Sequence, residues 1–142
     1  MALTICDWKY SKQWVWSITY DEALVDLYRF AIPHHEELGL PGHVEVVCGQ
    51  IGQTRNVTGS SFDSMRHMGG EELQELMERG WGVGVHGWSH RYIEPDMLDQ
   101  ELRVSRDALE EATGTEVSLY CAPNSNRNME DHILTRCREL GY

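Results

Sequence analysis

The sequence lacks a long hydrophobic run. No window of its 142 residues approaches the roughly eighteen consecutive apolar residues that a membrane-spanning helix needs. Residues 1–20 also lack the basic, apolar and small-residue order of a secretory signal peptide. We therefore expect no contact with a membrane, and a cytoplasmic location unless the chain is a fragment from which an export signal was removed.

Positive charge is also scarce. Twelve Lys and Arg stand against twenty-three Asp and Glu, which gives a formal net charge of −11. A nucleic acid backbone or an anionic lipid surface would be repelled by this field. Nucleic acid is therefore excluded as a partner, and a neutral small molecule or a sugar suits the chain better.

Cysteine spacing gives no sign of a metal cluster or a disulfide framework. The four cysteines, Cys6, Cys48, Cys121 and Cys137, form no C-x-x-C pair. In a chain without an export signal they are expected to be reduced thiols. The composition, with 41% apolar residues, five Trp and six Tyr, is that of one globular domain and excludes a disordered or collagen-like chain.

Strand and helix patterns alternate along the chain. Predicted strands cover residues 14–20, 43–47, 82–85 and 117–120, and predicted helices cover 24–38 (interrupted by Pro33), 71–79, 95–112 and 131–140. This alternation predicts an α/β fold with a mainly parallel sheet, in which sites gather at the carboxyl ends of strands. No repeat or linker divides the chain, so we expect residues 1–142 to be a single domain. The Gly- and Ser-rich loop 50–69 is long enough to carry function.

Two polar clusters follow predicted strands. Asp21 and Glu22 end the first strand, and His86–His90 follows the third. Because side chains alternate along a strand, Thr19 shares a face with Asp21, and Gly84 shares a face with His86. Small residues on these faces predict room for a pocket or an inner core layer beside the polar ends.

The opposite faces of these strands carry bulky residues. Trp14, Trp16 and Ile18 lie on one strand, and Val83 and Val85 on the other. These side chains are expected to pack beneath helices. The alternative interpretation of both patterns is a pair of strands with glycine kinks and solvated polar ends.

One carboxylate and two imidazoles form a familiar ligand set for a divalent metal. Glu22, His86 and His90 would leave a net charge near +1 on such an ion, enough to activate water and to polarise a carbonyl. The adjacent Asp21 would then act as the base. Hydrolysis is the reaction that this set of residues favours.

Three segments carry a resemblance to a known family. The segments Thr19-Tyr20-Asp21-Glu22, His86-Gly87-Trp88-Ser89-His90 and Tyr120-Cys121-Ala122-Pro123-Asn124-Ser125, in this order, resemble the motifs of the polysaccharide deacetylases of the NodB-homology family. That family has T-F-D-D-G after its first strand, H-[ST]-x-x-H after a later one and a relaxed R-x-P-x-G further on. The resemblance covers nearly the whole chain.

The resemblance implies an incomplete (β/α) barrel and a metal-dependent hydrolase that removes acetyl groups from acetylated sugars or polysaccharides. Asp21 matches the catalytic base of the family, Glu22 a metal ligand, and His86 and His90 the two histidine ligands. Zinc is the metal that the family favours, while cobalt, nickel and manganese suit the same ligand types. The expected partner is an acetylated carbohydrate or a small-molecule substrate.

The sequence departs from the family pattern at several positions. Glu22 replaces an Asp, Ala23 replaces a Gly, Gly87 replaces a Ser or Thr, and Cys121 stands where many members have an Arg. The chain also stops before the family segment that bears a histidine general acid. A catalytically degenerate NodB-like binding or structural module and an allantoinase-like cyclic amide hydrolase are therefore the alternative functions.

Other polar residues are weaker candidates for the site. Trp88 is predicted to stack on a sugar, and Tyr120 and Asn124 to line the pocket, with packing and plain loop roles as their alternatives. The remaining histidines are expected at the surface or at strand ends: His34, His35, His43, His67 and His132. An open sheet of four strand-helix units exposes its edges, which favours a homo-oligomer or a piece of a longer parent chain.

Overall fold

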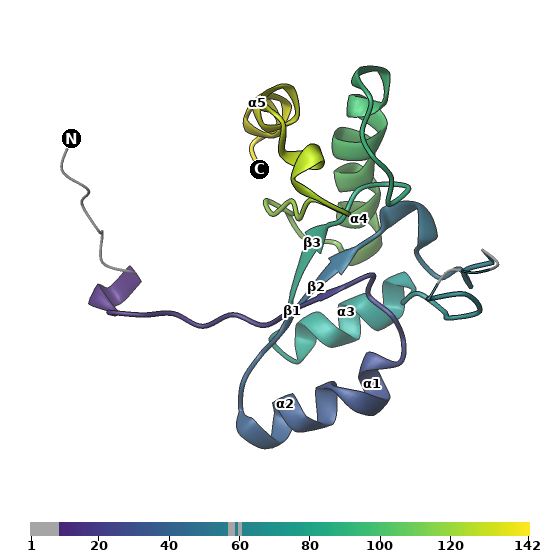
Figure 1. The fold of residues 1–142 in the computed structure, drawn as a ribbon. Coiled ribbons are helices and arrows are strands. Elements are labelled where there is room, and N and C mark those ends of the chain that lie inside the picture. Colours follow the sequence, from purple (N-terminus) through teal and green to yellow (C-terminus); the bar gives the residue numbers. More distant parts are fainter. Residues whose placement is uncertain (1–8, 57–58, 60) are drawn as a thin grey trace.

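Three short parallel strands form the sheet at the centre of the molecule (Figure 1). The computed structural model describes residues 9–56, 59 and 61–142. The strands are β1 (Thr19–Asp21), β2 (His43–Val46) and β3 (Gly82–Val85), in the order β1-β2-β3, and both pairings are parallel. The carboxyl ends of the strands therefore meet at one edge of the sheet, as the predicted α/β fold requires.

The first strand is shorter than predicted. Of the predicted strand 14–20, only the end pairs with β2, and the preceding residues run away from the sheet as an extended arm after a 3₁₀ turn, η1 (Lys9–Ser11) (Figure 1). Trp14 and Trp16 are 75% and 65% exposed, so the prediction that they pack beneath helices is wrong. The segment has the composition of a strand, but within the described residues no neighbouring strand pairs with it.

The predicted helix 24–38 consists of two helices. Helix α1 (Leu27–Phe30) and helix α2 (Ile32–Leu38) are separated at Ala31. Pro33 lies in the first turn of α2, where its missing N–H removes no helical hydrogen bond. Gly39, with φ of 64°, ends α2 in the left-handed conformation that favours glycine.

The later helices also follow the predicted pattern closely. Helix α3 (Gly70–Glu78) starts and ends one residue before its predicted bounds, and α5 (Asp131–Leu140) has them unchanged. The predicted helix 95–112 begins as a 3₁₀ turn, η3 (Pro95–Met97). It continues through a π-helical segment, η4 (Asp99–Val104), into helix α4 (Ser105–Thr113).

Two connections complete the description of the chain. The predicted fourth strand, 117–120, is reduced to a single parallel bridge between Val85 and Tyr120, so its pairing with β3 is confined to one residue pair. Short 3₁₀ turns lie at η2 (Cys48–Gln50) and η5 (Asn126–Met129). Among the described residues, no helix combines the length and the hydropathy that a membrane span needs.

The core lies on one face of the sheet. Helices α3 and α4 cover this face, and their side chains form a cluster with those of the strands. The buried members include Val44, Val46, Val83, Val85, Leu73, Leu76 and Leu109. Each fully buried aliphatic side chain contributes about 1.5–3 kcal/mol. A second buried cluster, which includes Leu102 and Ile133, holds α5 against η4.

The other face of the sheet is filled by a polar pair. Strand β2 places His43 and Glu45 there, with Nδ1 of His43 2.9 Å from Oε1 of Glu45. A Cβ on Gly82 would lie 2.2 Å from the His43 ring, and one on Gly84 would lie 2.3 Å from Glu45 Oε2. The glycines of β3 therefore give the room that the sequence predicted, and side chains of β2 occupy it.

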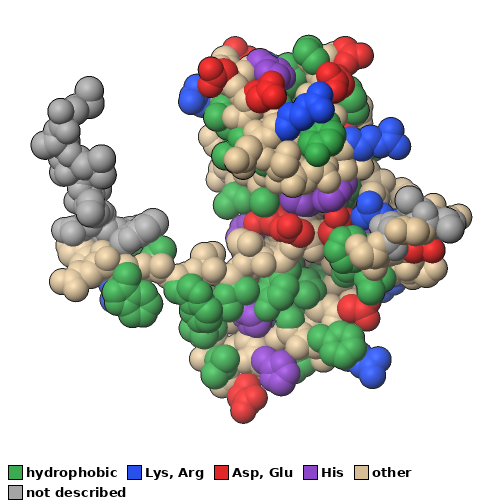
Figure 2. Space-filling view, viewed as in Figure 1, with side chains coloured by type: hydrophobic (Ala, Val, Ile, Leu, Met, Phe, Trp, Pro, Cys, Tyr) green, Lys and Arg blue, Asp and Glu red, His purple; other side chains and the backbone are tan. Residues whose placement is uncertain are grey.

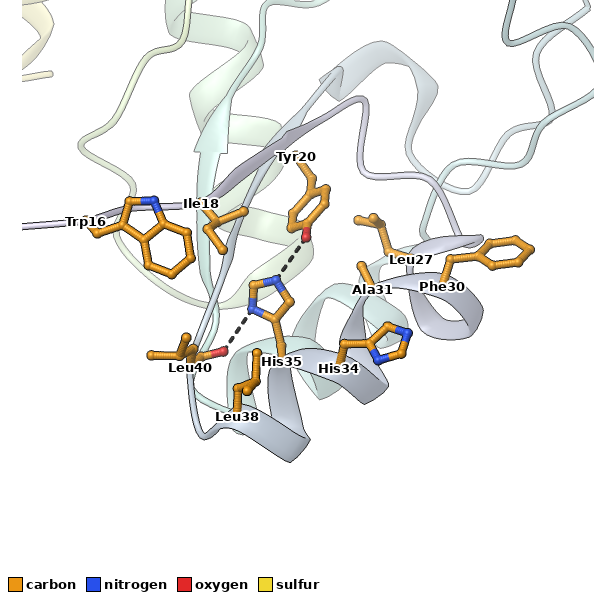
Figure 3. A pocket seen from close by; sticks show the side chains of 10 residues that line it. All are labelled: Trp16, Ile18, Tyr20, Leu27, Phe30, Ala31, His34, His35, Leu38 and Leu40. Carbon is orange, nitrogen blue, oxygen red and sulfur yellow. Dashed lines mark hydrogen bonds between the residues drawn. The ribbon is translucent and has the colours of Figure 1, made fainter.

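An apolar hollow of about 420 Å³ lies beside β1, between the N-terminal arm and helices α1 and α2 (Figure 3). His35 lies at its inner side and is only 6% exposed, so the prediction of a surface position for this histidine is wrong. Its Nδ1–H donates to the carbonyl of Leu40 at 2.8 Å, and its Nε2 accepts from the Tyr20 hydroxyl at 2.9 Å. These two bonds join α2, β1 and the following loop.

Candidate metal centre

The structure brings Glu22, His86 and His90 together. One ligand atom from each lies within 4.8 Å of the other two, at the carboxyl ends of β1 and β3. Oε1 of Glu22 is 2.9 Å from Nε2 of His90, and the rings of the two histidines are 5.0 Å apart. Figure 2 shows acidic and histidine side chains side by side across the middle of the molecule.

A backbone hydrogen bond orients His86. Its Nδ1 lies 3.0 Å from the carbonyl oxygen of Cys121, and because a carbonyl can only accept, Nδ1 carries the proton. The lone pair is then on Nε2, which is buried and has no hydrogen-bond partner. Histidine ligands of metals commonly donate their other N–H in this way. An unpartnered buried nitrogen beside a carboxylate therefore fits a metal ligand.

Cationic and imidazole groups surround the Glu22 carboxylate, which is 1% exposed. Arg55 donates to Oε2 of Glu22 at 3.0 Å, and Nδ1–H of His67 donates to the Glu22 carbonyl at 2.7 Å. Burial alone raises the pKa of Glu22, but His90, Arg55 and His67 together hold this pKa below its usual value. Glu22 is therefore an ionised carboxylate, as metal binding requires.

His67 is a buried residue of the site rather than a surface histidine. It is 2% exposed, and burial lowers its pKa, so it is neutral at physiological pH. The prediction of a surface or strand-end position for His67 is therefore wrong. Its hydrogen bond holds the backbone at Glu22, at a turn where Glu22 and Ala23 have φ of 72° and 48°. Left-handed backbone in residues other than glycine is costly and is concentrated at functional sites.

Glu101 organises the loop between the two histidines. Its carboxylate accepts from the backbone N–H of Trp88 at 2.6 Å, from that of Ser89 at 3.1 Å, and from the Ser89 hydroxyl. Glu101 is fully buried. At Gly87 the backbone has φ of 75°, and a Cβ there would lie 2.8 Å from Glu101 Oε2. Glycine at this position is thus required by the close approach of the carboxylate.

Asp21 and Cys121 also lie close to His86. Oδ2 of Asp21 is 3.9 Å from His86 Nε2, and the Asp21 side chain is 60% exposed. Asp21, His86 and the Sγ atom of Cys121 form a second group of ligand atoms within 4.8 Å of one another. Burial, together with the carboxylates of Glu45 and Asp21, raises the pKa of the Cys121 thiol to about 11.

The three residues predicted to bind substrate lie in different surroundings. Trp88 is half-buried and packs against the main core, and the Asn124 side chain donates to the His90 carbonyl at 3.1 Å. Tyr120 packs against Tyr142, and its hydroxyl donates to the Asn128 carbonyl. Because side chains alternate along an extended segment, the structure brings Cys121 to the site and turns Tyr120 into the core. The substrate-binding roles of Trp88, Tyr120 and Asn124 stay predictions.

Sequence reasoning did not single out Arg55 or Glu101. Arg55 lies in the loop 50–69, which was expected to carry function, but no motif distinguishes it from the other polar residues there. Glu101 lies in a predicted amphipathic helix beside Leu102, where a charged residue is usually solvent-exposed. Only the three-dimensional structure shows that Arg55 bonds to Glu22 and that Glu101 bonds to the loop between the two histidines.

Solved structures of known proteins share the fold of this chain. No curated protein matches the chain. Among solved structures, the deacetylase PplD of Streptococcus pyogenes, determined in complex with acetate, superposes with a TM-score of 0.72 at 21% identity, over 89% of this chain and 52% of that one. A de-N-acetylase from Aggregatibacter actinomycetemcomitans gives a TM-score of 0.70 at 11% identity, over 88% and 60%. IcaB from Ammonifex degensii gives 0.63 at 18%, over 85% and 55%.

These likenesses show the fold and confirm the predicted incomplete (β/α) barrel of the NodB type. The chain spans 52% to 60% of the length of the three solved structures. The sequence pattern of the polysaccharide deacetylase family matches residues 9–142, which is nearly the whole chain. With its fold and this match established, the chain belongs to the polysaccharide deacetylase family.

Proposed function

We propose that the chain binds a divalent metal through Glu22, His86 and His90 and hydrolyses acetyl groups from an acetylated carbohydrate. The observation that carries the proposal is the buried, unpartnered Nε2 of His86, which lies beside a buried carboxylate and a second imidazole. Family membership supports the acetylated carbohydrate as the class of substrate. The acetate complex of PplD is consistent with acetate as the product.

The ligand atoms suit zinc. Two imidazole nitrogens and one carboxylate oxygen are typical of catalytic zinc sites, which keep a further position open. A divalent metal held by these residues would supply Lewis acidity toward a carbonyl oxygen and toward water. Cobalt, nickel and manganese bind the same ligand types, so the metal content of the purified protein identifies the ion.

Asp21 is proposed as the base. It forms the last residue pair of β1 and β2 with Glu45, and its side chain is exposed, with Oδ2 3.9 Å from His86 Nε2. From there its carboxylate can accept a proton from the water that attacks an acetyl carbonyl. Glu22, by contrast, is buried and bonded to Arg55, so its carboxylate is not free to exchange protons with a substrate.

The proposal is tested by measuring acetate release from acetylated sugar oligomers before and after removal of metal. We expect release to fall to background after chelation and to recover on addition of Zn²⁺, because the proposed chemistry requires the ion. Release that is unchanged in metal-free protein would contradict the proposal. Turnover of cyclic ureides or imides without acetate release would favour the allantoinase-like alternative, and metal binding without any turnover would favour the degenerate module.

We also propose that a second copy of the chain covers the apolar surface beside β1. Phe30 and Leu38 are 61% and 69% exposed at the hollow of Figure 3, which the exposed Trp16 of the arm also lines. Strand β1 is an edge of the described sheet, and exposed edges with apolar surroundings favour association. Light scattering is expected to give a mass of at least a dimer. A monomer at high concentration would contradict this.

A further inference from the structure

The backbone places Cys121 beside the candidate metal centre. Residues 119–121 run parallel to the end of β3, where Val85 N–H donates to the Leu119 carbonyl and Cys121 N–H donates to the Val85 carbonyl, both at 2.9 Å. The Cys121 side chain therefore lies near the residue that follows Val85, which is His86. Its Sγ atom is within 4.8 Å of ligand atoms of His86 and Asp21.

An independent observation points to a ligand at this position. His86 is 2% exposed, and its Nε2 has no hydrogen-bond partner although its lone pair is available. This atom lies 3.9 Å from Asp21 Oδ2, and His86 belongs to both groups of ligand residues. A buried nitrogen without a partner is costly unless something binds to it. Two different sets of side chains that include His86 can therefore complete the coordination of an ion.

We propose that Asp21, His86 and Cys121 form a second, thiolate-containing metal site that competes with the Glu22–His86–His90 set for one ion. Thiolate is a soft ligand, so thiophilic divalent ions such as Cd²⁺ favour the second set over the first. When an ion binds, the S–H bond of Cys121 breaks, the sulfur–metal bond forms and the proton passes to solvent. The inference rests on the proposed function only for the role of the first set.

Occupation of the second set has a consequence for activity. It engages Asp21, the proposed base, and the His86 side chain that the first set also needs. A thiophilic ion bound there therefore inhibits the proposed hydrolysis. Replacement of Cys121 by serine is expected to relieve inhibition by Cd²⁺ and to leave the three ligands of the first set in place.

The direct test is Cd²⁺ titration of the metal-free protein, followed by the near-ultraviolet absorption of a sulfur-to-metal charge transfer. We expect this absorption in the wild-type protein and in His90→Ala. In Cys121→Ser it should fall to the level of the metal-free protein, and the affinity for Cd²⁺ should fall at least about 10-fold, since even changes outside the ligand set cost this much. Cys137→Ala is the matched control, because Cys137 is buried away from both sets and should leave the absorption unchanged.

Each other outcome overturns the inference. Absorption that persists in Cys121→Ser would assign the thiolate to Cys6, Cys48 or Cys137, which that variant retains. Cd²⁺ binding that gives no charge-transfer absorption in the wild-type protein would restrict the metal to the first set. Absorption that is lost in His90→Ala would make Cys121 an additional ligand of the first set and not part of a separate one. Circular dichroism of each variant shows whether it is folded. Acetate release by the Zn²⁺-loaded wild-type protein is measured separately, so failure of the proposed function is distinguished from failure of this inference.

Discussion

Replacement of His86 by alanine is expected to reduce acetate release to the uncatalysed background. His86 belongs to both groups of ligand residues, and its Nε2 atom is buried without a hydrogen-bond partner. Without it, Glu22 and His90 leave only two ligands from the first set, so we expect metal affinity to fall at least about 100-fold. The measurements are acetate release and the metal content of the purified protein.

The matched control for this variant is His132→Ala. His132 lies on α5, and its side chain is 39% exposed, away from the sheet edge that carries the site. Its replacement should leave acetate release and metal content unchanged. Equal rates of release in His86→Ala and in the wild-type protein would contradict the proposed mechanism. Since His86 is buried, the unfolding transition of the variant is recorded, and His90→Ala, whose side chain is more exposed, gives a second test of the same ligand set.

Replacement of Glu101 by alanine is expected to lower the free energy of unfolding by about 3–5 kcal/mol. The change leaves the partly buried N–H groups of Trp88 and Ser89 without an acceptor, at a cost of about 1–3 kcal/mol each, and it also opens a cavity. The loop between His86 and His90 loses its anchor, so metal affinity should fall as well. Denaturant unfolding monitored by tryptophan fluorescence measures the effect on stability.

Two other variants make the Glu101 result specific. Glu111→Ala changes an exposed carboxylate of α4 and should alter stability by less than about 0.5 kcal/mol. Glu101→Gln keeps one acceptor oxygen but introduces donors, so its loss of stability should be intermediate between those of the wild-type protein and the alanine variant. If Glu101→Ala were as stable as Glu111→Ala, the anchoring role would be wrong.

Much of the fold could be predicted because its helices and two of its strands carry strong local signals. Helix positions are predicted without tertiary information by the apolar spacing of α3 and α5 and by the glycine at position 114, directly after α4. Residues 14–18 show the limit of this approach. Their aromatic and β-branched side chains are typical of a strand, but a strand also requires a partner, which a local pattern does not contain.

The site could be predicted only as far as its motifs reach. The order of strands and the alternation of side chains are enough to predict that Glu22, His86 and His90 meet at one edge of the sheet, and the structure places them there. The contacts of Arg55 and His67 with Glu22 depend on how the loop 50–69 folds back over β1. That path is set by long-range hydrogen bonds, such as the one that the Met68 N–H donates to the Ala23 carbonyl. The spacing of apolar residues along the sequence does not predict such bonds.

The π-helical turn of η4 separates the long helical segment into two parts with different angular phase. Leu102 and Glu101, within the widened turn, face α5 and the histidine loop, whereas Leu109, within regular α-helix, faces the sheet. A widened turn of this kind accommodates an extra residue relative to regular helix. Deletion of one residue in this turn would therefore rotate Glu101 by roughly 100° relative to α4, because each α-helical residue advances the helix by that angle. The contact of the Glu101 carboxylate with the loop between His86 and His90 thus depends on an extra residue in the helix, so this segment should tolerate changes of length poorly.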